Sequence, residues 1–371
     1  MENTITIKQR LLEAFNVVYL HGVAPRIFFA GGRVNLIGEH IDYNGGHVLP
    51  CALDLGTYVA IRTRHDQRKV YHALGATGDW DKYPRGVVNA ILQAGYKLNS
   101  GFDLLVGGDL PLGAGLSSSA SLEVATAFAL SSTFGLDIPL VEIARLCQKA
   151  ENEYVGVNCG ILDQFAVAMG KDSQAIYLDT NTLEYEYVPM NLGEHELLIF
   201  DTKKKRELAS SKYNERRDEC EQALKCIQRD GVPNSLASAG DLIDSITNPI
   251  LYRRAKHVVS EEARTKKAVA LLKCCDLGAY GRLMNLSHLS LKNDYEVSCF
   301  ELDTMCEQLW QCDGVLGARM TGAGFGGCVI ALVKKSVSES VVERVLAAYK
   351  DITHLEGLCY RCTVGGEPRE I

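Results

Sequence analysis

The chain has 371 residues, 47% of them hydrophobic and 23% charged, and its formal net charge at pH 7 is −7. This length exceeds what one hydrophobic core usually fills, so a globular protein of two domains is expected. The negative charge disfavours non-specific nucleic-acid binding, and no apolar run reaches the 18 residues typical of a membrane span. We therefore expect neither a nucleic acid nor a membrane among its partners.

Strands and helices alternate along the chain, as judged by the spacing of apolar residues. In the first half, strands are expected at 26–30, 102–106, 174–178 and 196–201, and helices at 117–133, 139–153 and 161–169. Residues 47–64 carry two apolar stretches on either side of 54–57, which predict an antiparallel pair of strands. The second half is richer in helix, with helices expected at 207–227, 258–273, 295–311 and 336–349, and strands at 314–318, 327–333 and 359–364. The pattern indicates an α+β protein with two lobes, 1–195 and 196–371, whose boundary is approximate.

The thirteen cysteines are scattered and odd in number, and the first ten residues lack the layout of a signal peptide. Both features favour reduced thiols in a cytoplasmic protein. Cys359 and Cys362 form the only C-x-x-C motif, which lies in an expected strand and has no second ligand pair suited to zinc. We interpret this motif as structural.

The most informative segment is 111–121, which reads Pro-Leu-Gly-Ala-Gly-Leu-Ser-Ser-Ser-Ala-Ser and precedes an apolar, helix-forming run. The first N–H groups of a helix lack internal partners, and its dipole favours an anion there, so such a loop can bind phosphate. The ending Gly-Lys-Ser/Thr of a Walker A motif is missing, which argues against an ordinary P-loop ATPase. A helix cap built of small residues is the alternative, but three consecutive serines favour nucleotide phosphate.

Two further segments carry chemistry. Residues 32–46 place Arg33, Glu39, His40 and Asp42 within ten positions at the end of a strand, and these groups can hydrogen-bond to sugar hydroxyls. A polar turn is the alternative interpretation, although a turn needs no such concentration of chargeable groups. Residues 320–328 contain four glycines before an apolar strand, which allows a close backbone approach but also suits a bulge or a turn between lobes.

Taken together, these motifs resemble the galactokinases of the GHMP sugar and metabolite kinase superfamily. The matching segments are 32–46 for the galactokinase signature, 111–121 and 321–327 for the second and third superfamily motifs, 159–165 for the catalytic aspartate, and 201–220 and 288–303 for subgroup features. The resemblance implies the two-lobed GHMP kinase fold with the active site in the cleft between lobes. It also implies ATP-dependent phosphorylation of the anomeric hydroxyl of galactose, giving galactose 1-phosphate and ADP.

Site roles follow from the same resemblance. It implies that Asp163 acts as general base on the anomeric hydroxyl and that Arg33 keeps Asp163 ionised and offsets charge on the γ-phosphoryl group. The expected sugar ligands are Glu39, His40 and Asp42, with Tyr213 closing the pocket. The expected triphosphate-binding residues are Gly113, Ala114, Gly115, Leu116, Ser117, Ser118 and Ser119. Ser119 and Glu151 are expected to hold Mg²⁺, Trp80 to pack on adenine, and the protein to be a monomer like most bacterial relatives.

Several alternatives remain open at this level. On residue chemistry alone, Glu151 reads as a solvated helix residue, Trp80 as a core residue, and Arg33 with Asp163 as an inert ion pair. Ile41 replaces the threonine usual in galactokinases, as in N-acetylgalactosamine kinases, so the latter activity is one alternative. A non-catalytic galactose and ATP sensor on the same fold is another. Mevalonate-type kinases lack the set of Glu39, His40 and Asp42 and rank lower.

Overall fold

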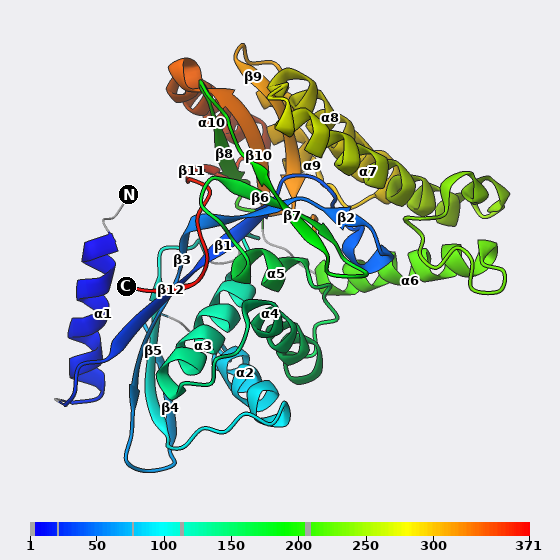
Figure 1. The fold of residues 1–371 in the computed structure, drawn as a ribbon. Coiled ribbons are helices and arrows are strands. Elements are labelled where there is room, and N and C mark those ends of the chain that lie inside the picture. Colours follow the sequence, from blue (N-terminus) through cyan, green and yellow to red (C-terminus); the bar gives the residue numbers. More distant parts are fainter. Residues whose placement is uncertain (1–3, 21, 76–77, 112–114, 205–208) are drawn as a thin grey trace.

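The computed structural model describes residues 4–20, 22–75, 78–111, 115–204 and 209–371. Figure 1 shows two lobes, with the elements of the first half in the lower lobe and α7 to α10 in the upper lobe. Helices and strands are mixed in both lobes, which confirms the expected α+β class and two-lobed architecture. In the described part of the chain, no helix is both long and apolar enough to cross a membrane.

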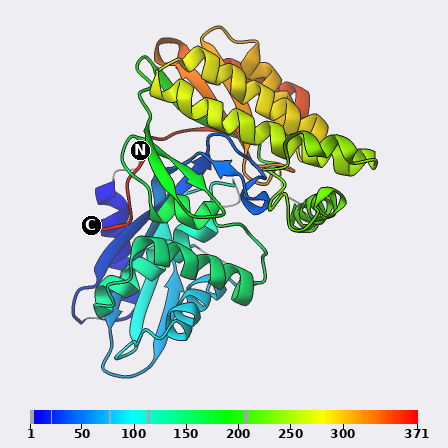
Figure 2. The same cartoon turned by 45° about the vertical axis from the view of Figure 1, so that its right-hand side comes forward.

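The first sheet carries the N-terminal lobe. Its strands, in spatial order, are β12 (Arg369–Glu370), β1 (Arg26–Asn35), β3 (Pro50–Thr63), β5 (Phe102–Gly108) and β4 (Lys69–Ala73). Alternate residues of β1 face opposite sides, as expected for a strand with both faces covered. Phe28 packs into the core beneath α3, whereas Ile27 and Phe29 pack with Leu11 and Phe15 of α1. Helix α1 (Thr4–Val18) therefore covers one face, and Figure 2 shows the helices α3 and α4 over the other.

The helices on that second face are α2 (Lys82–Gln93), α3 (Ser118–Phe134), α4 (Leu140–Lys149) and α5 (Leu162–Ala168). Helix α4 runs directly into a π-helical turn, Ala150–Val155. The expected helix over 139–153 therefore changes its winding in its last turn, where a π-bulge rotates the side chains that follow. This change moves Glu151 inward, as described below.

The prediction of an antiparallel pair of strands within 47–64 is wrong. Strand β3 runs unbroken through this region and pairs with β1, with Gly31 opposite Gly56. A Cβ atom on Gly56 would lie 2.1 Å from the carbonyl oxygen of Ala30, so glycine here permits close strand approach rather than a turn. The β1–β3 register also shifts between Gly31 and Arg33. Such a bulge redirects a strand, and Arg33 follows it directly.

The second sheet carries the C-terminal lobe in the order β11 (Leu358–Arg361), β8 (His195–Asp201), β10 (Cys328–Lys334) and β9 (Val315–Thr321). Along β10, Ile330 packs with α7 (Pro249–Lys273) and α8 (Leu277–Ser290), whereas Val329 packs with α9 (Phe300–Trp310) and α10 (Ser338–Thr353). Both faces of this sheet are thus covered. The remaining helix of this half is α6 (Ala209–Ile227), which is labelled to the right of the lobes in Figure 1.

Two helix starts differ from expectation. Helix α7 begins at Pro249 rather than 258, because the side chain of Asn248 caps its first N–H groups and proline suits the first helical position. Helix α9 begins at Phe300 rather than 295, because α8 ends in a π-helical turn, Leu291–Tyr295, that is followed by Glu296 in the left-handed region.

A third, small sheet joins β2 (His47–Val48), β6 (Gln174–Asp179) and β7 (Tyr185–Pro189). Short 3₁₀ segments lie at Asp42–Asn44, Gly240–Ser245 and Lys335–Val337. Strand β12 returns from the second half to pair with β1, so the last residues belong to the N-terminal sheet. The division at 195/196 stays a prediction, and it falls where β8 begins.

Candidate active site

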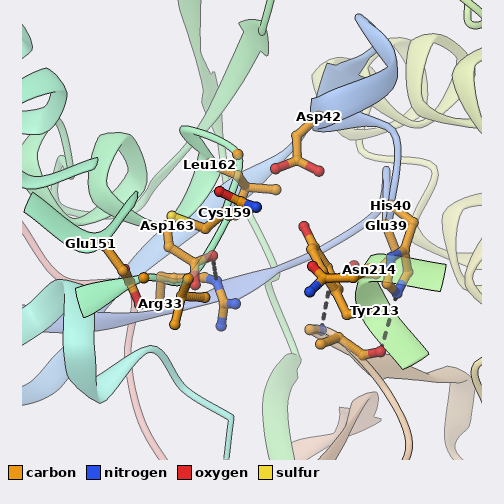
Figure 3. Close-up of a pocket in the computed structure, with 16 residues that line it drawn as sticks. Arg33, Glu39, His40, Asp42, Glu151, Cys159, Leu162, Asp163, Tyr213 and Asn214 are labelled. Atoms are coloured by element: carbon orange, nitrogen blue, oxygen red, sulfur yellow. Dashed lines mark hydrogen bonds and ion pairs between the residues drawn. The ribbon is translucent and has the colours of Figure 1, made fainter. Parts of the chain in front are cut away.

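A cavity of about 310 Å³ lies where the sugar-signature segment, α5, α6 and the third glycine-rich segment meet (Figure 3). The predicted site residues in its wall are Arg33, Glu39, His40, Asp42, Glu151, Asp163 and Tyr213. Residues that the sequence did not single out also line it, namely Asn158, Asn214 and Ala323 among others. Residues that are almost 300 positions apart in the sequence therefore line the same cavity.

Arg33 and Asp163 form the predicted pair. Nε of Arg33 lies 2.7 Å from Oδ1 of Asp163, as the dashed line in Figure 3 marks. Nη1 of Arg33 donates to the carbonyl of Gly115 at 2.8 Å, and its backbone N–H donates to the carbonyl of Leu116 at 3.1 Å. Arg33 thus ties the carboxylate to the phosphate loop. Gly113 and Ala114 lie outside the described residues.

Ser117 joins the loop to the same carboxylate. Its hydroxyl donates to Oδ2 of Asp163 at 2.5 Å, so each carboxylate oxygen has one protein donor. Ser117 stands at the N-cap of α3 in the left-handed region, at φ 58°, and its side chain makes no capping hydrogen bond. The Ser117 side chain therefore does not occupy the leading N–H groups of α3, the groups that the loop composition predicts to bind an anion.

Glu39 is nearly buried, with 4% exposure, and joins the two lobes. Oε1 accepts a hydrogen bond from the backbone of Gly322 at 2.6 Å, and Oε2 accepts from Arg319 and from Asn35, each at 2.8 Å. Burial raises the pKa of Glu39, while the charge of Arg319 opposes that rise. Glu39 therefore fixes the third glycine-rich segment against the sugar-signature turn.

His40 adopts the left-handed region at φ 61° and is neutral, because burial lowers its pKa to about 3. Nε2 lies 3.2 Å from the carbonyl of Ala323 and must donate to it. Nδ1 then accepts from the hydroxyl of Tyr43 at 2.9 Å, and Tyr43 in turn lies 2.7 Å from the hydroxyl of Tyr295. Both ring nitrogens are thus engaged within the protein.

Asp42 and Tyr213 face the cavity from opposite segments. Burial, followed by the negative charge of Asp163, raises the pKa of Asp42 to about 7. A Cβ atom on Gly160 would clash with the carboxylate of Asp42, so glycine at that position makes room for it. The Tyr213 ring, from α6, lies 5.6 Å from the His40 ring between centroids.

The structure brings Glu151 and Ser119 together. Glu151 is 7% exposed, so the interpretation as a solvated residue is wrong. Its Oε2 accepts from Nε2 of Gln164 at 2.6 Å, and its carboxylate is hydrogen-bonded to the Ser119 side chain. Burial and the charge of Asp163 raise its pKa to about 7. A hydroxyl and a carboxylate are oxygen ligands of the kind that Mg²⁺ takes.

Trp80 is half-buried before α2, packs against the main core, and does not line the described cavity. Ile41 is fully buried and lies against Gly46 rather than in the cavity wall. The replacement of threonine by isoleucine at this position therefore changes the core and not the cavity wall. None of the thirteen cysteines, all of which lie within the described residues, forms a disulfide.

The residues that support the sugar-signature turn were not predicted. Arg319 is fully buried in β9, and Glu261 of α7 accepts from the backbone of Gly38 at 3.0 Å. His257 of α7 lies 3.1 Å from the carbonyl of Glu39. A lone arginine within an apolar strand was the available signal for Arg319. Glu261, which accepts, and His257, which donates to the Glu39 carbonyl, had no such signal, because their partners are distant in sequence.

A phosphate loop at a helix N-terminus, a carboxylate–guanidinium pair beside it and two lobes around a cavity define a small-molecule kinase of the GHMP type. Family models agree: 82–171 match the GHMP kinases N terminal domain and 268–351 match GHMP kinases C terminal. Residues 13–63 match the galactokinase galactose-binding signature. The chain belongs to the galactokinases, since relatives of that name match it over nearly its whole length.

Two such relatives illustrate the likeness. Galactokinase of Clostridium beijerinckii is 46% identical over 94% of this chain and 95% of its own length. Galactokinase of Lactiplantibacillus plantarum is 44% identical over the full length of both chains. Among solved structures, Lactococcus lactis galactokinase complexed with galactose matches with a TM-score of 0.94 at 39% identity, covering 98% of this chain and all of the other. A mevalonate kinase structure, 20% identical with a TM-score of 0.63, shares the fold alone.

Proposed function

We propose that the cavity binds galactose with its anomeric hydroxyl at Asp163 and that ATP approaches along the loop before α3. As a galactokinase, the chain catalyses ATP-dependent phosphorylation of galactose to galactose 1-phosphate and ADP. One observation supports these roles above the others. Asp163 is bound on one oxygen by Arg33 and on the other by Ser117 of the phosphate loop, so the same carboxylate borders both the sugar cavity and the phosphate site.

In the proposed step, the γ-phosphoryl group passes from ATP to the anomeric oxygen of galactose. The anomeric O–H gives its proton to Asp163, and the oxygen forms a bond to the γ-phosphorus of ATP. The bond from that phosphorus to the β,γ-bridging oxygen breaks, and ADP leaves with the electron pair. Such a transfer depends mainly on positioning and charge neutralisation, and the Arg33 guanidinium supplies positive charge beside the reacting oxygens. The inert-pair interpretation is less favoured, because Arg33 also binds the loop at Gly115.

Mg²⁺ is the expected cofactor, and Ser119 with Glu151 would hold it. The donor set fits, because Mg²⁺ takes one or two protein oxygens and keeps several waters. The buried carboxylate of Glu151 also favours a cation nearby, since burial disfavours its ionised form when no cation balances it. When bound with ATP, the ion would neutralise charge on the β- and γ-phosphates.

The sugar-binding roles differ among the predicted residues. We propose that Asp42 and Tyr213 contact sugar hydroxyls directly. Glu39 already accepts three hydrogen bonds from the protein, so it would bind a sugar hydroxyl through a remaining lone pair. Both ring nitrogens of His40 are hydrogen-bonded within the protein, so His40 would shape the cavity wall. N-acetylgalactosamine kinase activity and a sensor function are not favoured, because Ile41 lies outside the cavity wall and Arg33 and Asp163 are both in place.

A sugar panel tests the proposal. Galactose, N-acetylgalactosamine, glucose, talose and arabinose would each be assayed with ATP and Mg²⁺ by coupled detection of ADP. The kcat/KM for glucose should be roughly 5- to 150-fold lower than that for galactose. This corresponds to about 1–3 kcal/mol of lost transition-state stabilisation, because the equatorial 4-hydroxyl of glucose leaves a buried protein group without its hydrogen-bond partner. Equal rates on galactose and glucose would contradict the assignment of the pocket. Binding of galactose and ATP without turnover would favour the sensor.

A further inference from the structure

Glu123 is a buried carboxylate that the proposed chemistry leaves without a role. It lies on α3 four residues after Ser119, so the two side chains share one face of that helix. Its exposure is 0%, and its Oε1 atom has no hydrogen-bond donor within the described residues. Its Oε2 atom accepts from Nε2 of Gln164, at 3.2 Å, and its carboxyl also contacts the carboxyl of Glu151.

Gln164 connects Glu123 to Glu151. The same Nε2 atom donates to Oε2 of Glu151 at 2.6 Å, so one amide group serves two carboxylates. Gln164 follows Asp163 directly on α5 and is itself fully buried, with its own Oε1 unpartnered. Glu151 lines the cavity whereas Glu123 does not, so Glu123 lies one layer deeper.

Such an arrangement is unfavourable for the fold by itself. A buried carboxylate needs a cation or several donors to offset its lost hydration, and Glu123 has one long hydrogen bond. No arginine, lysine or histidine contacts Glu123 in the described part of the chain. Burial, followed by the charge of Glu151, therefore raises the pKa of Glu123 well above its ordinary value. Ser119 and Glu151, in front of Glu123 and Gln164, mark where a cation would sit.

We propose that Glu123 is a positioning residue for the metal–nucleotide site: it holds Gln164, and Gln164 in turn fixes the Glu151 carboxylate in the orientation that a divalent cation needs. The inference rests on the Mg²⁺ site proposed above. Groups behind a metal ligand orient it, and their loss commonly lowers metal affinity about 10- to 100-fold. Glu123 itself touches neither substrate nor metal.

Glu123→Gln tests the inference, because it keeps the shape of the side chain and replaces the carboxyl group that faces Gln164 and Glu151. Mn²⁺ would replace Mg²⁺, and its binding in the presence of a non-hydrolysable ATP analogue would be measured by electron paramagnetic resonance. We expect Mn²⁺ affinity to fall at least about tenfold. The apparent KM for MgATP should rise while the galactose KM stays within about twofold, since the sugar wall is untouched. The Tm of the ligand-free protein should stay the same, because glutamine has nearly the shape and volume of the glutamic acid that it replaces.

Glu153→Gln is the matched control, since Glu153 lies in the same π-helical turn as Glu151 but is 62% exposed. It should leave Mn²⁺ affinity unchanged. Glu151→Gln tests the metal site separately from the positioning role of Glu123. Weaker Mn²⁺ binding in Glu151→Gln with normal binding in Glu123→Gln would overturn the positioning role alone. Normal binding in both would overturn the metal site and this inference with it. If Glu123→Gln folds poorly, with a lowered Tm, Glu123 is structural and the inference fails.

Discussion

The hydroxyl of Ser117 donates a 2.5 Å hydrogen bond to Oδ2 of Asp163, across the boundary between the phosphate loop and the sugar cavity. Arg33 holds the other oxygen of that carboxylate at 2.7 Å. Ser117 occupies the N-cap of α3, a position where serine usually bonds the helix backbone, yet its side chain makes no such bond. The residue that would cap the helix is directed to the proposed catalytic base, so it does not compete with the phosphate that we propose to bind at the helix N-terminus.

Asp163→Ala should abolish most turnover and retain ATP binding. Loss of a general base commonly lowers kcat by about 10²- to 10⁴-fold, whereas the loop before α3 keeps its backbone donors. Coupled detection of ADP would give kcat, and titration with a fluorescent ATP analogue would give affinity. Asp351→Ala, on the exposed surface of α10, is the control. Near-normal kcat in Asp163→Ala would remove the base assignment.

Ser117→Ala should lower kcat about 10- to 150-fold and change the galactose KM little. The variant removes a hydrogen bond to the charged Asp163 carboxylate, and such a bond contributes roughly 1.5–3 kcal/mol. Without it, the carboxylate is no longer held in a fixed orientation. Alanine adopts the left-handed backbone no more easily than serine, so the local strain is unchanged. Steady-state kinetics with each substrate in turn would measure the effect. An unchanged kcat would mean that Arg33 alone orients Asp163.

Chemistry that is concentrated in short motifs was predictable. Arg33, Glu39, His40 and Asp42 stand within ten residues, and the structure places all four in the wall of one cavity. The glycine–serine loop predicts a helix N-terminus, and α3 begins there. The resemblance to galactokinases added Asp163 and Tyr213, whose residue types alone would not distinguish them. The helix starting at 118 and the strands β5, β6 and β8 were expected within about two residues, because their apolar spacing is regular.

Features set by distant packing were not predictable. Gly56 looked like a turn residue, but its role depends on the carbonyl of Ala30 on the neighbouring strand. Glu151 looked solvated, because nothing local shows that a π-helical turn buries it against Gln164. Arg319 of β9 has a role only through its hydrogen bond to Glu39, and these two residues lie 280 positions apart in the sequence.

Arg319→Met should destabilise the protein by about 3–5 kcal/mol, because it leaves the buried Glu39 carboxylate without its cation. It should also raise the galactose KM more than the ATP KM, since Glu39 anchors the sugar-signature turn. Urea denaturation would give the free energy of unfolding. Arg361→Met is a matched control, since Arg361 forms half-exposed ion pairs with Glu196 and Glu339 and should cost at most about 1 kcal/mol. Equal losses in the two variants would contradict the proposed importance of the Glu39 pair.

Asp42 should make galactose binding depend on pH near neutrality. Its pKa is raised from 3.8 to about 7, by burial first and then by the charge of Asp163. An ionised carboxylate accepts stronger hydrogen bonds from sugar hydroxyls than a protonated one, so the galactose KM should fall as the pH rises from 6 to 8. Asp42→Asn should bind galactose more weakly and lose this dependence. A wild-type KM that is flat from pH 6 to 8 would exclude Asp42 as the titrating sugar ligand.

The same shift predicts a stability signature with a definite sign. Between about pH 4 and pH 7, Asp42 is protonated in the folded protein but ionised in the unfolded chain, so the folded state binds the extra proton. Its contribution to the free energy of unfolding is therefore full below pH 4 and is lost as the pH rises through 7. Wild type should lose stability relative to Asp42→Asn across that window, as measured by urea denaturation at each pH. Galactose should oppose the loss above pH 7, because it binds the ionised form and so stabilises the folded state.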